Sequence, residues 1–190
     1  MKKKSVKWTI VLVSLVVVFA GVSGVVWENH RPVSPTHQLK SSEQPTSVAP
    51  MIGYRVPSFS LPSIPDNQLI SLADYQGKAV LINFWASWCP PCQSETSDLV
   101  KAFAKYGNEV QFIGVNLSSQ DSLQDVTAFL AKYGVKYPVV LDTKGAVAQQ
   151  FQTMAIPTSF FVNRQGIIID RYVGAITPQE LERDLQRISQ

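Results

Sequence analysis

The chain has 190 residues, 45% of them hydrophobic, and a formal net charge of +3. This length suits one domain of ordinary size plus an appendage. The excess positive charge lies at the N-terminal tip, because removing Lys2, Lys3, Lys4 and Lys7 leaves 13 basic and 14 acidic residues. The composition therefore excludes a nucleic-acid-binding surface on the folded part of the chain.

A run of 20 residues without a charge, residues 8–27, follows these lysines. As a helix it would be about 30 Å long, which matches the hydrocarbon core of a bilayer. Trp8 and Trp27 stand at its two ends, where aromatic residues meet the membrane interface. Residues 1–27 are therefore predicted to be a cytoplasmic tip and a transmembrane anchor. The chain would then be a single-pass cell-membrane protein whose C-terminal domain is extracytoplasmic.

The alternative interpretation of the same segment is a cleaved signal peptide. The segment is long for the hydrophobic region of such a peptide, and no Ala-x-Ala cleavage site follows it. The nearest candidate is Val22-Ser23-Gly24. No cysteine lies near it, which rules out a lipoprotein anchor.

Residues 28–50 are rich in Pro, Ser, Thr and Gln and poor in large apolar side chains. This composition predicts a disordered linker, which as a flexible coil would span about 25–30 Å. Its two histidines, His30 and His37, are interpreted as solvated linker residues rather than metal ligands. The folded domain is predicted to cover residues 51–190.

The domain begins with a predicted β-hairpin, in which residues 59–61 and 68–71 flank the turn residues Pro65, Asp66 and Asn67. The apolar run AVLINFW, residues 79–85, is typical of a buried parallel strand. Strands and helices then alternate along the chain. We expect further strands at 110–117 and 138–141, helices at 91–106, 122–133 and 145–151, and a strand pair at 158–163 and 166–173.

The last predicted helix has a strong start signal. Thr177 is its expected N-cap, Pro178 stands at the first helical position, and Glu180 completes a capping box. The order of elements indicates an α/β fold with a central mixed β-sheet flanked by helices and an added N-terminal β-hairpin.

The chain has two cysteines, Cys89 and Cys92, only three positions apart. One short bridge cannot staple a domain of this size, which excludes a disulfide scaffold. A zinc site needs about four Cys or His ligands, and both histidines lie outside the predicted domain. We therefore expect no metal and no cofactor, and a redox role for the pair.

The position of the pair after a predicted strand and at the start of a helix favours a reactive thiolate. Backbone N–H groups and the helix dipole stabilise a thiolate on Cys89 and lower its pKa. Cys92 lies one turn inside the helix and is more shielded. We therefore expect Cys89 to attack a substrate disulfide and Cys92 to resolve the mixed disulfide. Pro91 fits the first helical turn, and Pro90 stiffens the loop.

The segment FWASWCPPC, residues 84–92, resembles the active-site segment of thioredoxins, and AIPT, residues 155–158, resembles their cis-proline loop. With the predicted anchor, the leading hairpin and a glutamate three residues after the second cysteine, the pattern is similar to the ResA/TlpA-like branch of extracytoplasmic thioredoxins. The resemblance covers about residues 51–190 and implies a thioredoxin-like fold. The central pair Pro90-Pro91 replaces a Glu-Pro pair, so neither redox potential nor substrate is carried over.

Cytosolic thioredoxins have a buried aspartate where this chain has Asn83, so the proton acceptor beneath the resolving cysteine is missing. In the ResA-like branch a glutamate supplies acid–base function, and Glu95 occupies its position. The resemblance thus implies a catalytic role for Glu95 beside Cys89 and Cys92. The alternatives are that Glu95 is only a first-turn helix residue favoured by the dipole, and that Asn83 is only a satisfied polar group.

Two tryptophans flank the loop before the cysteines. Trp85 is predicted to pack in the core, whereas Trp88 adjoins Cys89 and is expected to shield the cysteines and contact substrate. The resemblance implies a cis bond between Ile156 and Pro157, which would present the backbone of Ile156 to a substrate and keep metals away from the thiols. The predicted substrate-binding set is Trp88, Pro90, Ile156 and Pro157.

The leading functional hypothesis is dithiol–disulfide exchange outside the cytoplasmic membrane. By resemblance we expect a reductase that receives electrons from a membrane-embedded thiol carrier and acts on exported protein disulfides, such as those of apocytochrome c in cytochrome c biogenesis. The same residues could serve a disulfide-forming oxidase. A thiol peroxidase would need a Pro-x-x-x-Thr-x-x-Cys context and a nearby arginine, and no arginine lies between Arg55 and Arg164. A non-enzymatic binding module would gain nothing from the cysteine spacing.

Overall fold

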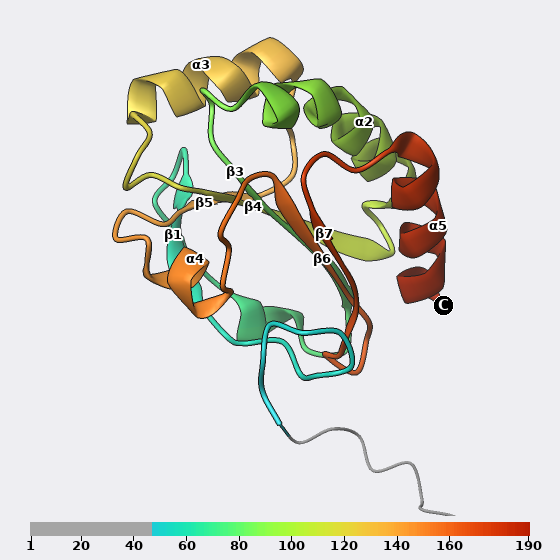
Figure 1. The fold of residues 1–190 in the computed structure, drawn as a ribbon. Coiled ribbons are helices and arrows are strands. Elements are labelled where there is room, and N and C mark those ends of the chain that lie inside the picture. The colour runs from blue at the N-terminus through green and yellow to red at the C-terminus, as the bar shows by residue number, and fades with distance from the viewer. Residues whose placement is uncertain (1–46) are drawn as a thin grey trace, which may run out of the picture. The chain divides into compact units, whose positions relative to one another are not determined.

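The computed structural model describes residues 47–190, which form a layered domain around one β-sheet (Figure 1). The strands lie in the order β2-β1-β5-β4-β3-β6-β7. Their bounds are β1 Ser60–Ile64, β2 Leu69–Ser71, β3 Ala79–Trp85, β4 Val110–Asn116, β5 Val139–Leu141, β6 Thr158–Val162 and β7 Ile168–Val173. The helices are the 3-10 helix η1 Leu72–Tyr75 and the α-helices α2 Pro90–Tyr106, α3 Leu123–Tyr133, α4 Ala146–Gln150 and α5 Pro178–Ser189.

The sheet is mixed, as the alternation of elements predicts. β3, β4 and β5 are parallel, whereas β6 pairs antiparallel with β3 and with β7. β3 is buried along its whole length, because strands pair with it on both sides and helices cover both faces. The predicted α/β class and the thioredoxin-like architecture are confirmed.

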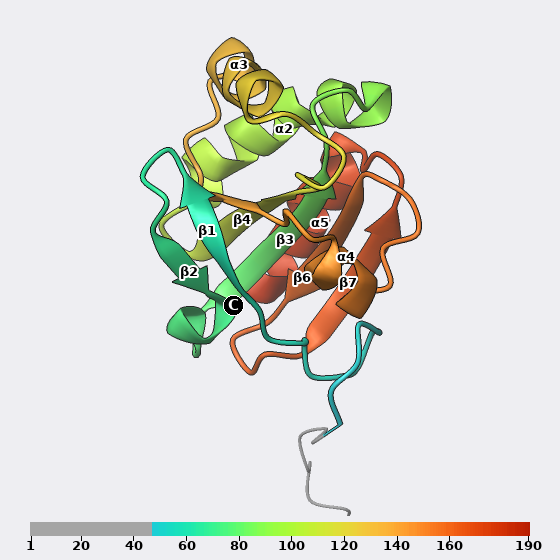
Figure 2. The same cartoon turned by 90° about the vertical axis from the view of Figure 1, so that its left-hand side faces the viewer.

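The predicted N-terminal hairpin is present but longer in its first strand. β1 runs on to Ile64, and its last residues, Ser63 and Ile64, pair antiparallel with Val140 and Val139 of β5. The hairpin is thereby attached to the main sheet as its edge (Figure 2). The turn after Ile64 includes a cis Ile64–Pro65 bond, which the sequence pattern did not predict.

Two apolar cores lie on opposite faces of the sheet. One core joins α2, α3 and α5 to the sheet through side chains such as Leu81, Leu99, Phe129 and Leu185. The other core lies under η1 and α4 and is built around a group of aromatic side chains, Phe59, Phe84, Phe151 and Phe160. Figure 1 shows the two sets of helices on the two sides of the sheet.

The predicted helix ends match the local capping chemistry. Ser122 caps α3 by accepting the Asp125 backbone N–H, and Gly134 ends that helix with a left-handed backbone, which costs glycine little. At α5 the Thr177 hydroxyl oxygen accepts the Glu180 N–H, and the Glu180 carboxylate accepts the Thr177 N–H. The capping box predicted for this helix is confirmed.

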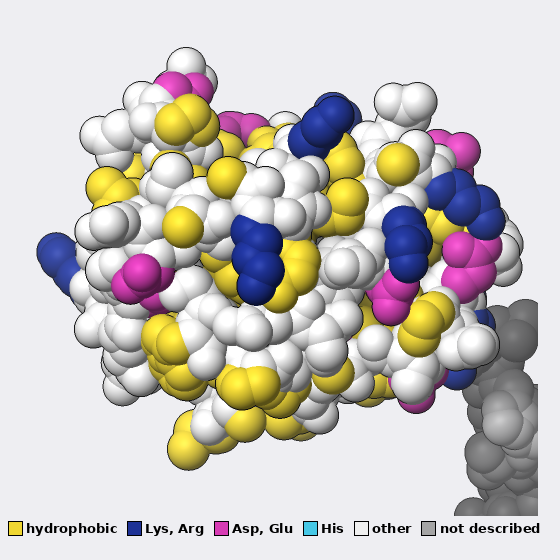
Figure 3. Space-filling view, turned by 90° about the horizontal axis from the view of Figure 1, so that it is seen from above, with side chains coloured by type: hydrophobic (Ala, Val, Ile, Leu, Met, Phe, Trp, Pro, Cys, Tyr) yellow, Lys and Arg dark blue, Asp and Glu magenta, His cyan; other side chains and the backbone are white. Residues whose placement is uncertain are grey.

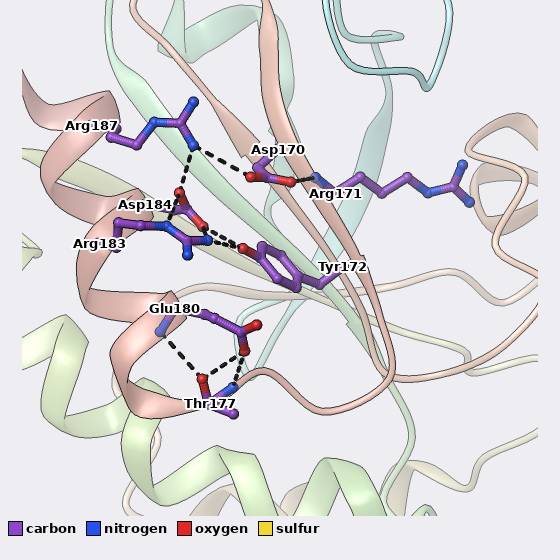
Figure 4. A network of polar contacts seen from close by, with 8 residues as sticks. All are labelled: Asp170, Arg171, Tyr172, Thr177, Glu180, Arg183, Asp184 and Arg187. Atoms are coloured by element: carbon purple, nitrogen blue, oxygen red, sulfur yellow. Dashed lines mark hydrogen bonds and ion pairs between the residues drawn. The ribbon is translucent and has the colours of Figure 1, made fainter.

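A network of charged groups attaches α5 to β7 (Figure 4). Asp184 on α5 is fully buried, and its carboxylate accepts hydrogen bonds from Arg183, from Arg187 and from the hydroxyl of Tyr172 on β7. Arg187 also reaches Asp170 on β7 at 3.4 Å. The network fixes the C-terminal helix on the edge of the sheet through groups that lie 12 and 17 positions apart in the sequence.

The membrane anchor predicted at residues 1–27 and nearly all of the predicted linker at 28–50 lie outside the described residues. Within residues 47–190, no helix has both the length and the apolar character needed to cross a membrane. The domain boundaries therefore stay predictions.

Candidate active site

The two cysteines lie where β3 ends and α2 begins. Cys89 is the N-cap of α2, and its Sγ is bonded to Sγ of Cys92 in a disulfide. The backbone N–H of Cys92 donates to Cys89 Sγ at 3.3 Å. Both residues are buried, with 3% of Cys89 and 1% of Cys92 exposed. An N–H group at a helix N-terminus stabilises negative charge on Cys89 sulfur once the disulfide is opened.

The loop between β3 and α2, residues 86–88, is held by an aspartate that the sequence interpretation missed. The Asp121 carboxylate accepts the Ser87 backbone N–H at 2.7 Å and the Ser87 hydroxyl at 2.6 Å. It also accepts a hydrogen bond from the side chain of Asn116, which is fully buried. Since β3 and β4 are parallel neighbours, the residues after each strand meet at one edge of the sheet. The parallel pairing of these strands was the signal that could have indicated a polar residue after β4 beside the active-site loop.

The segment before β6 faces the cysteines. The Ile156–Pro157 bond is cis, as the resemblance implied, and Cys89 Sγ lies 3.6 Å from the carbonyl oxygen of Ile156. The Pro157 carbonyl accepts the backbone N–H of Gly174, which ties the segment to the end of β7. The structure therefore brings together four predicted site residues, Cys89, Cys92, Ile156 and Pro157.

Glu95 lies one turn beyond Cys92 on α2 and is buried, with 3% of the residue exposed. Its carboxylate accepts the side-chain N–H of Asn83 at 2.9 Å and the backbone N–H of Ile176 at 3.0 Å. Asn83 also donates to the hydroxyl of Ser159 on β6. Both donors to Glu95 are neutral. Burial raises the pKa of Glu95 to about 7, and the hydrogen bonds from Ile176 and Asn83 oppose part of that rise.

These contacts do not fit the alternative in which Glu95 is only a first-turn residue favoured by the helix dipole. Glu95 is outside the first turn of α2 and is enclosed by β3, α2 and the segment before α5. The contacts of Asn83 satisfy its amide, but they also place that amide on the Glu95 carboxylate. The side chains of Ser159 and the backbone of Ile176 were not predicted as part of this group, because they lie 64 or more positions from Glu95 in the sequence.

Trp85 lies in the core, as predicted, whereas Trp88 lies at the surface. Trp85 is 4% exposed and packs against Phe129, with ring centroids 4.5 Å apart. Trp88 is 53% exposed, and its indole N–H donates to the Gln120 carbonyl at 2.8 Å. Pro90 is exposed at the start of α2. A substrate could reach these last two residues from solvent.

Several large apolar side chains of the domain are exposed to solvent. Met154, two residues before Ile156, is 92% exposed, and Leu123 at the start of α3 is 60% exposed. In Figure 3 hydrophobic side chains spread over the part away from α5, whereas basic and acidic side chains lie next to each other on the α5 side. Over residues 47–190, no three His, Cys, Asp or Glu side chains come together in a way that could hold a metal ion.

Comparisons with known proteins agree with this geometry. The Redoxin family model matches residues 51–186. The chain is 36% identical over 134 residues to the thioredoxin-like protein YneN of Bacillus subtilis, covering 70% of this chain and 78% of that protein. It is 31% identical over 139 residues to the thiol-disulfide oxidoreductase ResA of Bacillus cereus, covering 73% and 79%. A thiol:disulfide interchange protein from Chlorobium tepidum superposes with a TM-score of 0.65 at 28% identity, covering 72% of this chain and 96% of that one.

Proposed function

We infer the function of this chain from one premise: it belongs to the Redoxin family and is a ResA/TlpA-like thiol-disulfide oxidoreductase. We propose that it acts outside the cytoplasmic membrane as a reductase of disulfides in exported proteins. The observation that carries the exchange chemistry is the placement of Cys89 at the N-terminus of α2, with the Cys92 N–H on its sulfur and the Ile156 carbonyl beside it. The direction and the location are proposed from the resemblance to the ResA/TlpA-like branch.

The proposed reaction begins with the reduced dithiol. The Cys89 thiolate attacks one sulfur of the client disulfide, a mixed disulfide forms, and the other client sulfur leaves as a thiolate. Cys92 then loses its proton and attacks Cys89 Sγ. This step releases the second client thiolate and forms the Cys89–Cys92 disulfide. The client gains the two electrons that the dithiol loses.

Glu95 is proposed to take the proton of Cys92. It lies one turn away on the same helix, and a carboxyl group with a pKa of about 7 can both accept and return a proton near neutral pH. Asn83 on β3 cannot ionise. The Glu95 carboxyl group that accepts its hydrogen bond can, and it is therefore the group proposed to exchange the proton. Asn83 and Ile176 hold its carboxylate in place.

The client is proposed to bind over the cis Ile156–Pro157 segment. A carbonyl group 3.6 Å from Cys89 Sγ lies where an extended client chain could pair with it. Trp88 and Pro90 would contact the client beside the disulfide, because both are exposed at the start of α2.

The reduced state must be restored by another dithiol. We propose a membrane-embedded thiol carrier as the electron donor, an N-terminal anchor at residues 8–27, and apocytochrome c among the clients. The uncharged 20-residue segment after four lysines supports the anchor, and the resemblance to the ResA/TlpA-like branch supports the donor and the client. Membrane fractionation with intact-mass analysis tests the anchor. A soluble mature form starting near Val25 would contradict it.

Trapping of mixed disulfides tests the roles of the two cysteines. Cys92→Ser should retain clients on Cys89, because the resolving thiol is missing, whereas Cys89→Ser should retain few. Non-reducing electrophoresis of both full-length variants measures the trapped fraction. Equal trapping by the two variants contradicts the assignment.

The reduction potential of the Cys89–Cys92 pair tests the direction. A potential near the thioredoxin value of about −270 mV supports a reductase, and one near the DsbA value of about −120 mV supports the alternative of a disulfide-forming oxidase. Equilibration of the full chain with glutathione or dithiothreitol buffers gives this value.

A further inference from the structure

A cavity of about 320 Å³ lies around the start of β3, whereas the cysteines follow its end. The seven residues of β3 separate the two places by about 20 Å. Three basic residues line the cavity and come from three separate segments. They are Arg55 before β1, Lys78 before β3 and Arg164 between β6 and β7.

No acidic side chain is among the residues that line this cavity. Asp74, which stands close in sequence, instead accepts the backbone N–H of Ser71. Residues 47–190 carry eleven Lys and Arg against twelve Asp and Glu, so the domain as a whole is not basic. Three cations around one cavity are therefore a local feature.

The three cations have no carboxylate partner among the residues that the structure describes. Arg183 and Arg187, by contrast, form ion pairs with Asp184. Arg55 donates one N–H to the Gln165 carbonyl, and Arg164 donates one to the Ser189 carbonyl. A guanidinium group has five N–H donors, so each arginine is held in position with donors to spare.

We propose that this cavity binds a phosphate group, either as inorganic phosphate or as the headgroup of an anionic phospholipid. Two arginines and one lysine from three segments around one cavity suit a tetrahedral oxyanion, which can accept hydrogen bonds from several directions at once. The segment that carries Arg55 also contacts the first described residues, because the Arg55 backbone N–H donates to the Ser47 carbonyl. The predicted anchor precedes that point in the sequence, which makes a lipid headgroup one of the two sources.

Protection of Lys78 from acylation tests the proposal without using the cysteines, so its outcome is independent of the redox function. Lys132 is a matched internal control, because both lysines are exposed and each lies near a tyrosine ring, at 6.0 Å for Lys78 and 5.0 Å for Lys132. The full chain in a non-ionic detergent at low salt is pulsed with an acetylating reagent, and mass spectrometry measures each lysine. If the cavity takes the free anion, inorganic phosphate at ten times its dissociation constant should slow acylation of Lys78 about tenfold and leave Lys132 unchanged.

Vesicles distinguish the two sources of phosphate. Protection by inorganic phosphate supports a free anion, whereas protection by phosphatidylglycerol vesicles but not by phosphate or phosphatidylcholine vesicles supports a lipid headgroup. Arg164→Gln and, separately, Arg55→Gln should each weaken protection about tenfold, since each removes a charge-assisted contact. Lys144→Gln, an exposed site that does not line the cavity, should have no effect. The proposal is overturned if neither probe protects Lys78, if Lys132 is protected equally, or if both arginine variants keep the wild-type protection.

Discussion

Two buried carboxylates lie on helices that cover the same face of the sheet, Glu95 on α2 and Asp184 on α5. The groups that donate hydrogen bonds to them differ in charge. Glu95 accepts hydrogen bonds from two neutral donors, the side chain of Asn83 and the backbone N–H of Ile176. Asp184 accepts from two guanidinium groups and a phenol. Burial raises the pKa of both carboxyl groups, but at Asp184 the hydrogen bonds led by Arg183 outweigh burial and lower the pKa below its usual value.

The comparison shows that burial alone does not decide what a carboxyl group can do. A cationic partner stabilises the ionised form and fixes Asp184 as an anion. Neutral donors hold the Glu95 carboxyl in place without fixing its charge, which leaves it able to exchange a proton near pH 7. Asp184 therefore suits a structural role, and Glu95 suits acid–base chemistry at the cysteines.

The largest expected effect is on catalysis by Glu95→Gln. If Glu95 takes the proton of Cys92, the variant should exchange disulfides about 10²-fold more slowly, since general acid–base help is typically worth about 10²–10⁴ in rate. Removing the negative charge should also lower the pKa of the cysteine thiols. Stopped-flow exchange with a model disulfide and a pH titration of thiol alkylation measure the two effects.

Asp98→Asn is the matched control for that prediction. Asp98 lies on the same helix, one turn beyond Glu95, and pairs with exposed Lys101. It should leave exchange rates and thiol pKa values at wild-type levels. Unchanged rates and unchanged thiol pKa values in Glu95→Gln would leave Glu95 with a packing role alone.

The second expected effect is on stability against pH. The pKa of Glu95 is about 7 in the folded protein against an ordinary value of 4.5, so between these values the folded state binds a proton that the unfolded state releases. Stability should therefore fall as pH rises from about 4.5 to 7, by up to about 3 kcal/mol. Urea unfolding of the oxidised protein across this range measures the slope. Glu95→Gln should remove this slope, and a wild-type slope in the variant would assign it to another group.

Asp184 should act in the opposite sense and at lower pH. Its pKa is lowered in the folded protein, so its stabilising effect is complete above the ordinary value of 3.8 and is lost as pH falls through the folded value. Asp184→Asn should destabilise the domain by about 2 kcal/mol at pH 6, because an amide cannot accept from three charged or hydroxyl donors. Chemical unfolding measures the loss. Exchange rates should stay at the wild-type level, and a matching loss of activity would link the two regions.

Local signals predicted the framework of both regions. The strand at 79–85, the start of α2 at the cysteines and the capping box of Thr177 and Glu180 follow from apolar runs and capping residues, and the structure has them within one or two positions. The partners of Glu95, and the contact of Asp184 with Tyr172 on β7, could not be predicted in the same way. Ile176 is 81 positions from Glu95, and such contacts depend on how α2, α5 and the sheet pack.

Asp121 illustrates the same limit at the active-site loop. Its hydrogen bonds to Ser87 span 34 positions and exist because β3 and β4 end side by side. The sequence predicted that buried strands such as β3 would be parallel to their neighbours. It did not predict the register that brings Ser87 to Asp121. The residues of a site that depends on such a register can be identified only once the fold is known.

The smallest expected effect separates the partners of Asp184 from one another. Arg187 donates to Asp184 at 2.8 Å, but its side chain is 48% exposed, and Arg183 and Tyr172 still donate when it is removed. Water screens a half-exposed charge, so Arg187→Gln should cost only about 0.5–1 kcal/mol. Urea unfolding at low and at high salt measures this cost, and the difference from wild type should shrink as salt rises.

Lys101→Gln, which removes the exposed pair with Asp98, is the control and should cost less, because Asp98 is partly open to water. A cost for Arg187→Gln as large as that of Asp184→Asn would contradict this division. In that case one exposed arginine, rather than the whole set of donors, would keep Asp184 ionised.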